Sequence, residues 1–404
     1  MVALLGALKR GVTAALLNPQ LTAEESAQIL DELKPARVID HADAVSTETG
    51  EWASVEEPTV PGIVLYTSGS TGRPKGALLS HFALAFANRS WAGPIMKLTP
   101  DDRVLAVLPF PHSLGLNGAL LAPLIAGAAV VIVERFIPEA VVAALVRHRV
   151  TFFPGVATMF RRILGSVTVN EADFRTVRFA LSGAAPCPWD LAEEWRRRTG
   201  VRILRGYGLT ELFRPISYLA DDPRDFPDAI GRIVPEVEAR VVDDDGQALP
   251  AGEVGELLLK TPAVMDGYLN APEETRAVLL HGWFQTGDLA TLSPEGFVRI
   301  VGRKKELILR GGYSVHPLEV EAALLRHPEV AEVAVVGVRH EELGEEVAAF
   351  VSLRRGALTT VEELTTWCRS RLAAYKCPRR FTLVDELPKS ATGKILKSRL
   401  SHPA

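Results

Sequence analysis

Short apolar segments alternate with helical patterns through the first half of the chain, and this alternation restricts the available folds more than any other feature. Helical patterns separate most of the predicted strands. These strands lie at residues 62–67, 103–108, 128–133, 150–153, 177–181 and 201–204. Apolar strands joined by helices are typical of a parallel sheet that helices cover on both faces. The sequence therefore predicts an α/β fold.

Capping signals locate two of the helices. Thr22 is followed three residues later by Glu25, and this capping box predicts a helix that runs to about Leu33. Ser80 precedes a second predicted helix that begins at His81. A short strand is expected at residues 37–40, directly after the first helix.

The composition indicates a globular protein with more than one domain. The 404 residues exceed the roughly 250–300 at which a single core stops growing. A net charge of -4 implies no basic field of the kind that favours nucleic-acid binding. Three cysteines without a CxxC pair argue against a disulfide framework or a zinc site and favour a reducing cytoplasm. The apolar run at 118–133 contains Pro123 and Gly127 and is too short for a membrane span.

The pattern of elements changes after about residue 235. Short strands are predicted at 238–242, 253–260 and 297–301, and polar residues 302–306 form a candidate boundary. The remaining residues predict a small α+β domain, with helices at 317–325 and 361–372 and strands at 330–338 and 347–353. We therefore expect a large domain over 1–302 with layered parallel sheets, helices and a β-rich subdomain, a hinge at 303–305, and a small mobile α+β domain over 306–404.

The segment at 66–77 reads YTSGSTGRPKGA and follows a predicted strand. Its glycines allow close backbone approach, its hydroxyls and Lys75 offer hydrogen bonds and positive charge, and such a loop suits a polyphosphate. It is not a Walker loop, because Lys75 precedes a glycine and the glycine spacing differs. The competing interpretation is a flexible linker, which the position between a strand and a helix disfavours.

This segment closely resembles the phosphate loop of the adenylate-forming superfamily, which contains acyl- and aryl-CoA synthetases, luciferases and peptide-synthetase adenylation domains. Further motifs match that family in the expected order: PFPH at 109–112, SGAAP at 182–186, GYGLTE at 206–211, GWFQTGD at 282–288, GRKKE at 302–306 and PKSATGKI at 388–395. The resemblance implies a nucleotide-binding set: Thr67, Ser68, Gly69, Ser70, Thr71, Gly72, Lys75, Gly183, Ala184, Ala185, Gly206, Tyr207, Gly208, Asp288 and Arg303.

By the same resemblance, Tyr207 stacks on adenine, Thr210 bonds the α-phosphate and Glu211 is the magnesium ligand. A carboxylate beside a hydroxyl also suits a hard cation that bridges phosphate oxygens. Asp288 would hold both ribose hydroxyls. The competing interpretations, which the matching motifs disfavour, are that Glu211 simply starts a helix and that Asp288 is an ordinary turn residue.

The C-terminal motifs imply a moving catalytic domain. Lys305 would be the pivot, and Lys394 would bridge the substrate carboxylate and the α-phosphate, where a flexible ammonium can neutralise growing charge. Gly312 would line the channel for a pantetheine arm after the domain swings. Without the resemblance, Arg303 and Lys305 are typical of a solvated linker, and Lys394 of a solubilising residue.

The acyl pocket is the least specified part of the resemblance. Its candidates are His112, Gly155, Val156, Met159 and Ser182. A lone histidine is more often structural, and only its matching position favours a role for His112. The candidates include no charged residue for an amino group, which favours an aryl or aliphatic acid over an amino acid.

The resemblance implies an acyl-CoA ligase that uses ATP, Mg²⁺ and coenzyme A, forms an acyl-AMP with release of pyrophosphate, and transfers the acyl group to coenzyme A with release of AMP. The chain begins late relative to the family, so an apolar face covered by a homo-oligomeric or other partner is expected. The alternatives are an enzyme for thioester formation alone, a carrier-protein ligase and a non-catalytic nucleotide-binding subunit.

Overall fold

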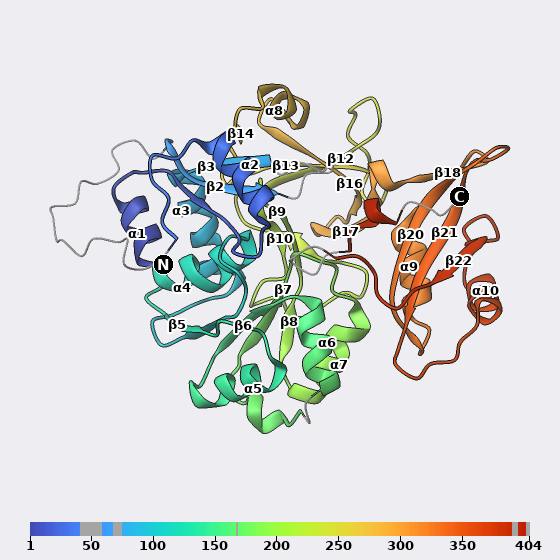
Figure 1. Cartoon of the computed structure of the whole chain (residues 1–404), viewed down its shortest axis with the longest axis horizontal. Helices are drawn as coiled ribbons and strands as arrows, with labels where there is room; N and C mark the ends of the chain where they lie inside the picture. Colours follow the sequence, from blue (N-terminus) through green and yellow to red (C-terminus); the bar gives the residue numbers. More distant parts are fainter. Residues whose placement is uncertain (41–58, 68–74, 167–168, 390–394, 401–404) are drawn as a thin grey trace. The chain divides into compact units, whose positions relative to one another are not determined.

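The structure is a computed structural model that describes residues 1–40, 59–67, 75–166, 169–389 and 395–400 (Figure 1). The chain divides into two compact units. The first contains Met1–Ala239, Leu259–Gln285 and Glu295–Phe297, and the second contains Arg240–Leu258, Thr286–Pro294 and Val298–Ala404. Residues of the β-rich segments thus occur in both units. The hinge at 303–305 stays a prediction.

A five-stranded parallel sheet forms the centre of the first unit, as the alternation of apolar segments predicted. Its strands lie in the order β5 (Ala129–Ile132), β4 (Arg103–Ala106), β6 (Phe152–Gly155), β7 (Phe179–Ser182) and β8 (Arg202–Leu204). Successive side chains on a strand point to opposite faces. Phe152 and Phe153 accordingly belong to two different core clusters.

Helices cover both faces of this sheet. On the first, α5 (Pro138–Arg147), α6 (Ala157–Ser166), α7 (Trp189–Thr199) and the short η4 (Glu171–Phe174) surround a core that contains the fully buried Trp195. The other core cluster draws residues from the sheet and from η2 (Trp91–Ile95), η3 (Leu114–Leu121) and α4 (Ala122–Ile125). Coverage of both faces is confirmed.

A second sheet in this unit contains the stem of the predicted phosphate loop. Its order is β1 (Ala14–Leu16), β2 (Pro61–Thr67), β3 (Lys75–Ser80) and β14 (Gly267–Tyr268). β1 is parallel to β2, and the other pairs are antiparallel. The Ser80 hydroxyl accepts a hydrogen bond from Ala83 N at the start of α3 (His81–Ser90), so the predicted cap is confirmed.

The remaining elements of the first unit are mostly short. β10 (Phe213–Ser217) pairs antiparallel with both β9 (Gly206–Leu209) and β11 (Gly231–Ile233). The other elements are α1 (Val2–Lys9), α2 (Ala23–Leu33), α8 (Pro272–Val278) and β15 (Leu279–Leu280). Helix α2 has the capping box between Thr22 and Glu25 that the sequence predicted.

The second unit contains most of β12 (Glu238–Val242), β13 (Gly255–Lys260), β16 (Trp283–Leu292) and β17 (Phe297–Arg303), which are neighbours in that order. Its other sheet has the order β19 (Tyr313–Val315), β18 (Ile308–Arg310), β21 (Gly344–Leu353) and β20 (Val330–His340), with β22 (Arg380–Leu383) parallel to β21. Helices α9 (Pro317–Leu325) and α10 (Val361–Arg369) pack on this sheet around a core that includes Val335 and Leu364. Two short turns, η5 (Lys304–Glu306) and η6 (Lys397–Arg399), complete the unit.

The predicted strand at 37–40 is wrong. These residues form no regular structure, and Val38 and Ile39 are 56% and 47% exposed. An isolated apolar pair does not make a strand without a neighbouring edge to pair with.

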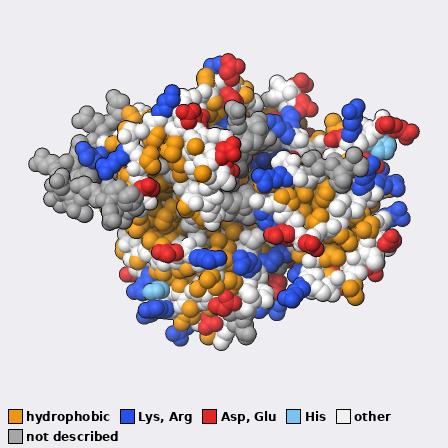
Figure 2. All heavy atoms as spheres, viewed as in Figure 1, with side chains coloured by type: hydrophobic (Ala, Val, Ile, Leu, Met, Phe, Trp, Pro, Cys, Tyr) orange, Lys and Arg blue, Asp and Glu red, His pale blue; other side chains and the backbone are white. Residues whose placement is uncertain are grey.

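Three surface and covalent features complete the description. Cys187, Cys368 and Cys377 are all free thiols. Across the described ranges, the helices are too short or too polar to cross a bilayer. On the face drawn in Figure 2, acidic and basic side chains are interspersed, as expected for a net charge of -4.

Candidate active site

The stem of the phosphate loop is a β-hairpin. Thr67 and Lys75 lie opposite each other where β2 ends and β3 begins. The predicted contacts Ser68, Gly69, Ser70, Thr71 and Gly72 lie outside the described residues. Pairing of β2 with β3 therefore brings the two described ends of the loop segment together.

Lys75 and Glu211 both contact one tyrosine, Tyr268, the lysine at its ring and the glutamate at its hydroxyl. The Lys75 ammonium is 5.2 Å from the centroid of the Tyr268 ring. The Tyr268 hydroxyl donates a 2.7 Å hydrogen bond to Glu211 Oε1. Burial, together with the charge and hydrogen bond of Glu211, raises the pKa of Tyr268 far above its ordinary range, so the phenol stays protonated. The structure thus gathers the predicted phosphate lysine and the predicted magnesium carboxylate around a residue that sequence reasoning missed.

A second tyrosine–carboxylate pair lies on the same sheet. Tyr66 donates a 3.0 Å hydrogen bond to Glu32 of α2. Burial, then the hydrogen bond and charge of Glu32, raises the pKa of Tyr66 above its ordinary range. This pair fixes α2 against the stem of the loop.

The GYGLTE motif forms strand β9 and the turn that follows it. A Cβ at Gly208 would lie 1.8 Å from the Phe213 carbonyl oxygen, and a Cβ at Gly206 would lie 2.3 Å from Arg214 Nη2. Packing alone therefore requires a glycine at positions 206 and 208, whether or not these residues contact a nucleotide. Tyr207 is half-buried and pairs with Ile216 across β10.

Arg214 is a buried cation that sequence reasoning also missed. Its guanidinium donates to Ser217 Oγ at 2.9 Å, to the Ser182 carbonyl at 3.0 Å and to the Leu204 carbonyl at 3.1 Å. Burial lowers the pKa of Arg214 to about 9. These bonds connect the ends of β7 and β8 to β10, and the signal in the sequence was a single charge inside the apolar run at 212–219.

The predicted adenine turn follows β7. Gly183 packs against Arg214, with a hypothetical Cβ 3.0 Å from Nη1. Ala184 has a positive φ of 64°, a left-handed backbone conformation that is uncommon outside glycine. Ala185 continues this turn. The turn thus leaves the sheet abruptly at the carboxyl end of a parallel strand, where ligands of open α/β sheets bind.

Part of the predicted acyl pocket gathers at the same edge. Gly155 and Ser182 are opposite each other at the carboxyl ends of β6 and β7. Val156 follows β6 and is 8% exposed, and Met159 packs against both core clusters. A Cβ at Gly155 would lie 3.0 Å from the Phe160 ring.

His112 is held as a neutral imidazole. Asn18 Nδ2 lies 3.2 Å from its Nε2. An amide nitrogen only donates, so Nε2 is the acceptor and carries no proton. Burial lowers the pKa of His112, which favours the neutral form of the ring. The contact with Asn18 gives His112 a structural role. Its role at the acyl pocket stays a prediction.

In the second unit, Asp288 and Arg303 are opposite each other in β16 and β17 and form a 3.0 Å ion pair. The Asp288 side chain is 4% exposed. Asp288 N donates to Thr286 Oγ1 at 3.0 Å. The predicted ribose contact Asp288 and the predicted nucleotide-binding residue Arg303 are therefore brought together, and the ion pair orients the carboxylate.

The predicted hinge and thiol-channel residues also lie in the second unit. Lys305 is exposed in η5, and its neighbour Lys304 pairs with Asp244 and Glu256 at 2.9 and 3.1 Å. Gly312 has φ +86°, and it lies in the turn between β18 and β19. A side chain at Gly312 would strain this turn.

Lys394 lies outside the described residues, but ion pairs hold both flanks of its motif. Lys389 pairs with Glu332 at 2.8 Å, and Lys397 pairs with Glu306 and Glu321, each at 2.8 Å. A bridge between Lys389 and Ile395 closes the base of the segment. The two flanks are thereby fixed on the small sheet and on η5.

Glu211 is a suitable single protein ligand for Mg²⁺. Within the described ranges, histidines, cysteines and acidic residues do not gather in threes around a metal-sized centre. Mg²⁺ is commonly held by one or two carboxylates together with substrate phosphates, so a lone carboxylate fits it. Oε1 of the buried Glu211 is used by Tyr268. Its Oε2 accepts no hydrogen bond from the described residues and is available to a cation.

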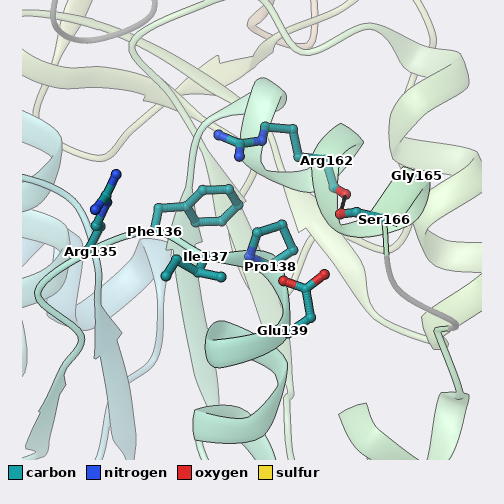
Figure 3. Close-up of a pocket in the computed structure, with 8 residues that line it drawn as sticks. All are labelled: Arg135, Phe136, Ile137, Pro138, Glu139, Arg162, Gly165 and Ser166. Carbon is teal, nitrogen blue, oxygen red and sulfur yellow. Dashed lines mark hydrogen bonds between the residues drawn. The ribbon is translucent and has the colours of Figure 1, made fainter. Parts of the chain in front are cut away.

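A separate surface pocket lies beside α5 and α6 (Figure 3). Phe136, Ile137 and Pro138 line it together with Arg162, whose guanidinium lies 5.1 Å from the Phe136 ring centroid. The residues predicted for the active site do not line it. This pocket therefore adds nothing to the candidate active site.

Comparison with known proteins identifies the class. The family described as AMP-binding enzyme matches residues 1–269, and the AMP-binding enzyme C-terminal domain matches residues 319–394. The first match alone covers more than half of the chain. The chain therefore belongs to the AMP-binding enzyme family, which confirms the resemblance read from the motifs.

Among the similar proteins are several CoA ligases and CoA synthetases. A long-chain-fatty-acid–CoA ligase of Bacillus subtilis is 36% identical over 84% of this chain, which spans 61% of that protein. A feruloyl-CoA synthase of Amycolatopsis is 37% identical over 84% of this chain and 69% of that protein. The o-succinylbenzoate coenzyme A synthetase of Bacillus subtilis in complex with ATP and magnesium ion has a TM-score of 0.86 at 31% identity and covers 98% of this chain and 86% of its own.

Proposed function

We propose that this chain is an AMP-forming acyl-CoA ligase. The observation that carries the proposal is the cluster of Lys75, Tyr268 and Glu211, which gathers a cation and a buried carboxylate at the stem of the phosphate loop. Similarity to CoA ligases, one of them solved with ATP and magnesium, supports this assignment.

The first half-reaction forms an acyl-adenylate. An oxygen of the acid's carboxylate attacks the α-phosphorus of ATP, and the bond to the pyrophosphate oxygen breaks. Positioning and electrostatics account for most of the catalysis in such transfers. Lys75 and the loop hydroxyls would hold the phosphates, Thr210 the α-phosphate and Glu211 the magnesium ion. Mg²⁺, when bound, neutralises charge on the phosphate oxygens.

Asp288 and Arg303 would bind the ribose side of the nucleotide. Their ion pair orients the Asp288 carboxylate, whose oxygens could accept hydrogen bonds from two ribose hydroxyls. Tyr207 would stack on the adenine, with Gly183, Ala184 and Ala185 along its border. Lys394 would stabilise the charge that develops as pyrophosphate leaves.

The second half-reaction forms the thioester. A thiolate attacks the acyl carbonyl carbon, and AMP leaves with the bonding electron pair. We infer rotation of the small domain about Lys305, which withdraws Lys394 and brings Gly312 to the site. Coenzyme A is the proposed thiol, with the pantetheine arm of a carrier protein as the alternative.

The acid is proposed to be aryl or aliphatic. Gly155 and Ser182 end neighbouring strands with apolar Val156 and Met159 beside them, and this favours an uncharged acyl group. The three free cysteines support a cytoplasmic location.

A panel of carboxylic acids tests the proposed function. The protein is incubated with ATP, Mg²⁺ and each acid, with either coenzyme A or a holo carrier protein, and AMP and thioester are quantified. We expect acid-dependent AMP formation and a thioester with coenzyme A. Supply of synthetic acyl-adenylates in place of ATP separates the two half-reactions. Thioester formation from acyl-adenylates alone would contradict adenylation by this chain.

A further inference from the structure

We propose that Tyr268 is a positioning residue for the metal–nucleotide complex: its hydroxyl fixes the Glu211 carboxylate so that Oε2 faces the cation. The inference rests on the proposed function, because it takes Glu211 as the magnesium ligand. It adds a residue from a different part of the chain, 57 positions from Glu211.

The contact between the two side chains is short and well protected. The Tyr268 hydroxyl lies 2.7 Å from Glu211 Oε1, and Glu211 is 9% exposed. The terminal torsion of a glutamate is broad and nearly free. A hydrogen bond to one oxygen removes that freedom and determines the direction of the other oxygen. Loss of a side chain that holds a metal ligand in this way typically weakens metal binding about 10- to 100-fold.

The backbone reinforces the same arrangement. Met265 N donates a 2.8 Å hydrogen bond to the Glu211 carbonyl oxygen. Leu269 N donates to the Gly76 carbonyl oxygen at 2.7 Å, and Tyr268 pairs with Ala77 across β14 and β3. Residues 265–269 therefore connect the metal carboxylate to the strand that leaves the phosphate loop.

The ring of Tyr268 serves a second charged group. Lys75 Nζ lies 5.2 Å from the ring centroid, within the range of a cation–π contact. The hydroxyl acts on Glu211 and the ring acts on Lys75. Replacement of Tyr268 by phenylalanine therefore removes the first contact and keeps the second.

A purely structural role for Tyr268 makes a different prediction. If the hydroxyl only satisfied a buried carboxylate, its loss would lower stability and weaken all ligands alike. A positioning role weakens binding of the metal in the nucleotide complex and spares the nucleotide without metal.

The test measures metal binding rather than turnover. Mn²⁺ is titrated into the full chain with a non-hydrolysable ATP analogue, and free Mn²⁺ is read by electron paramagnetic resonance. AMP binding without metal is measured by calorimetry on the same samples. The variants are Tyr268→Phe, Glu211→Gln and the double variant. Tyr66→Phe is the matched control, because it removes a 3.0 Å phenol–carboxylate bond on the same sheet.

Tyr268→Phe is expected to weaken Mn²⁺ binding about tenfold, with AMP affinity and Tyr66→Phe both close to wild type. The double variant should match Glu211→Gln, because Tyr268 acts through Glu211. Wild-type Mn²⁺ affinity in Tyr268→Phe, an equal loss of AMP affinity, or additive losses in the double variant would overturn the inference. If Glu211→Gln itself binds Mn²⁺ normally, the magnesium site of the proposed function fails, and this inference fails with it.

Discussion

One buried side chain and one backbone carbonyl explain two glycines of the GYGLTE motif. The Arg214 guanidinium occupies the space where a Cβ at Gly206 would be, 2.3 Å from Nη2, and Gly183 contacts the same group. Gly208 lies against a backbone carbonyl. Any larger residue at these two positions would therefore clash with the surrounding protein, independently of the nucleotide contacts that we propose for the motif.

Gly206→Ala is expected to destabilise the protein by about 1–3 kcal/mol, because an extra methyl must displace a buried, hydrogen-bonded guanidinium. Urea unfolding followed by fluorescence measures this. Gly165→Ala in α6 is the control, since open space surrounds that position, and it should be neutral or stabilising by roughly 0.5–1 kcal/mol. Equal stabilities of the two variants would refute the packing explanation.

The sequence predicted site residues that lie in motifs, and it did not indicate the residues that contact them from other parts of the fold. Glu211 and Lys75 stand in recognisable strings, whereas Tyr268 reaches them only because β14 pairs with β3. Arg214 gave a weak signal as a charge within an apolar run. Which buried carbonyls it would bond depends on how β7 and β8 end beside β10.

At the scale of elements, the buried carboxylate of Asp102 holds together the chain segments that lead into three strands of the parallel sheet. Asp102 is 3% exposed and accepts hydrogen bonds from Thr151 Oγ1 at 2.7 Å and from Thr99 N at 2.8 Å. Arg178 Nη2 contacts Asp102 Oδ2 at 2.8 Å. This group joins the chain before β4 to the segments before β6 and β7.

The pKa of Asp102 is lower than its ordinary value. Burial raises it, but hydrogen bonds from Thr151 and Thr99 and the charge of Arg178 outweigh burial. A carboxyl whose folded pKa is depressed stabilises the fold above its unfolded pKa of about 3.9, and the stabilisation is lost as pH falls through the folded pKa.

Asp102→Asn should therefore cost about 2 kcal/mol at pH 7, and the difference from wild type should shrink as the pH falls below about 4. Denaturant unfolding across pH measures it. The exposed neighbour substitution Asp101→Asn should stay within about 0.5 kcal/mol of wild type. A difference for Asp102→Asn that does not change with pH would contradict this explanation.

Elements with local signals were the most predictable. The capping box of Thr22 and Glu25 and the proline that begins α9 gave helices with the expected starts. Five of the six predicted apolar strands gave the parallel sheet, with boundaries that shift by one or two residues. The strand predicted at 62–67 instead lies in the other sheet, antiparallel to β3. The strand expected at 37–40 was wrong because apolar character alone does not supply a partner edge. The division of the β-rich strands between two compact units depends on pairing that a single sequence does not reveal.

At the scale of the whole molecule, the two proposed half-reactions depend on different residues. Lys394→Ala should slow adenylation about 100- to 1000-fold and leave thioester formation from a supplied acyl-adenylate nearly intact. Rapid-quench assays of each half-reaction measure this.

Gly312→Leu should do the reverse, because a bulky side chain at a positive φ obstructs the proposed thiol channel. The same two assays apply, with Gly356→Leu as a control for strain at another turn glycine, φ +83°. Equal losses in both half-reactions for Lys394→Ala and Gly312→Leu would contradict a mechanism with two domain arrangements.

The central claim is that Glu211 and the phosphate loop hold ATP for attack by an acid. The most direct test is the exchange of labelled pyrophosphate into ATP, measured with an acid from the panel and with folding checked by circular dichroism. We expect exchange that requires both acid and Mg²⁺ in the wild type and falls at least about 100-fold in Glu211→Gln. Exchange in Glu211→Gln at the wild-type rate, or its absence in the folded wild type with every acid, would contradict the account.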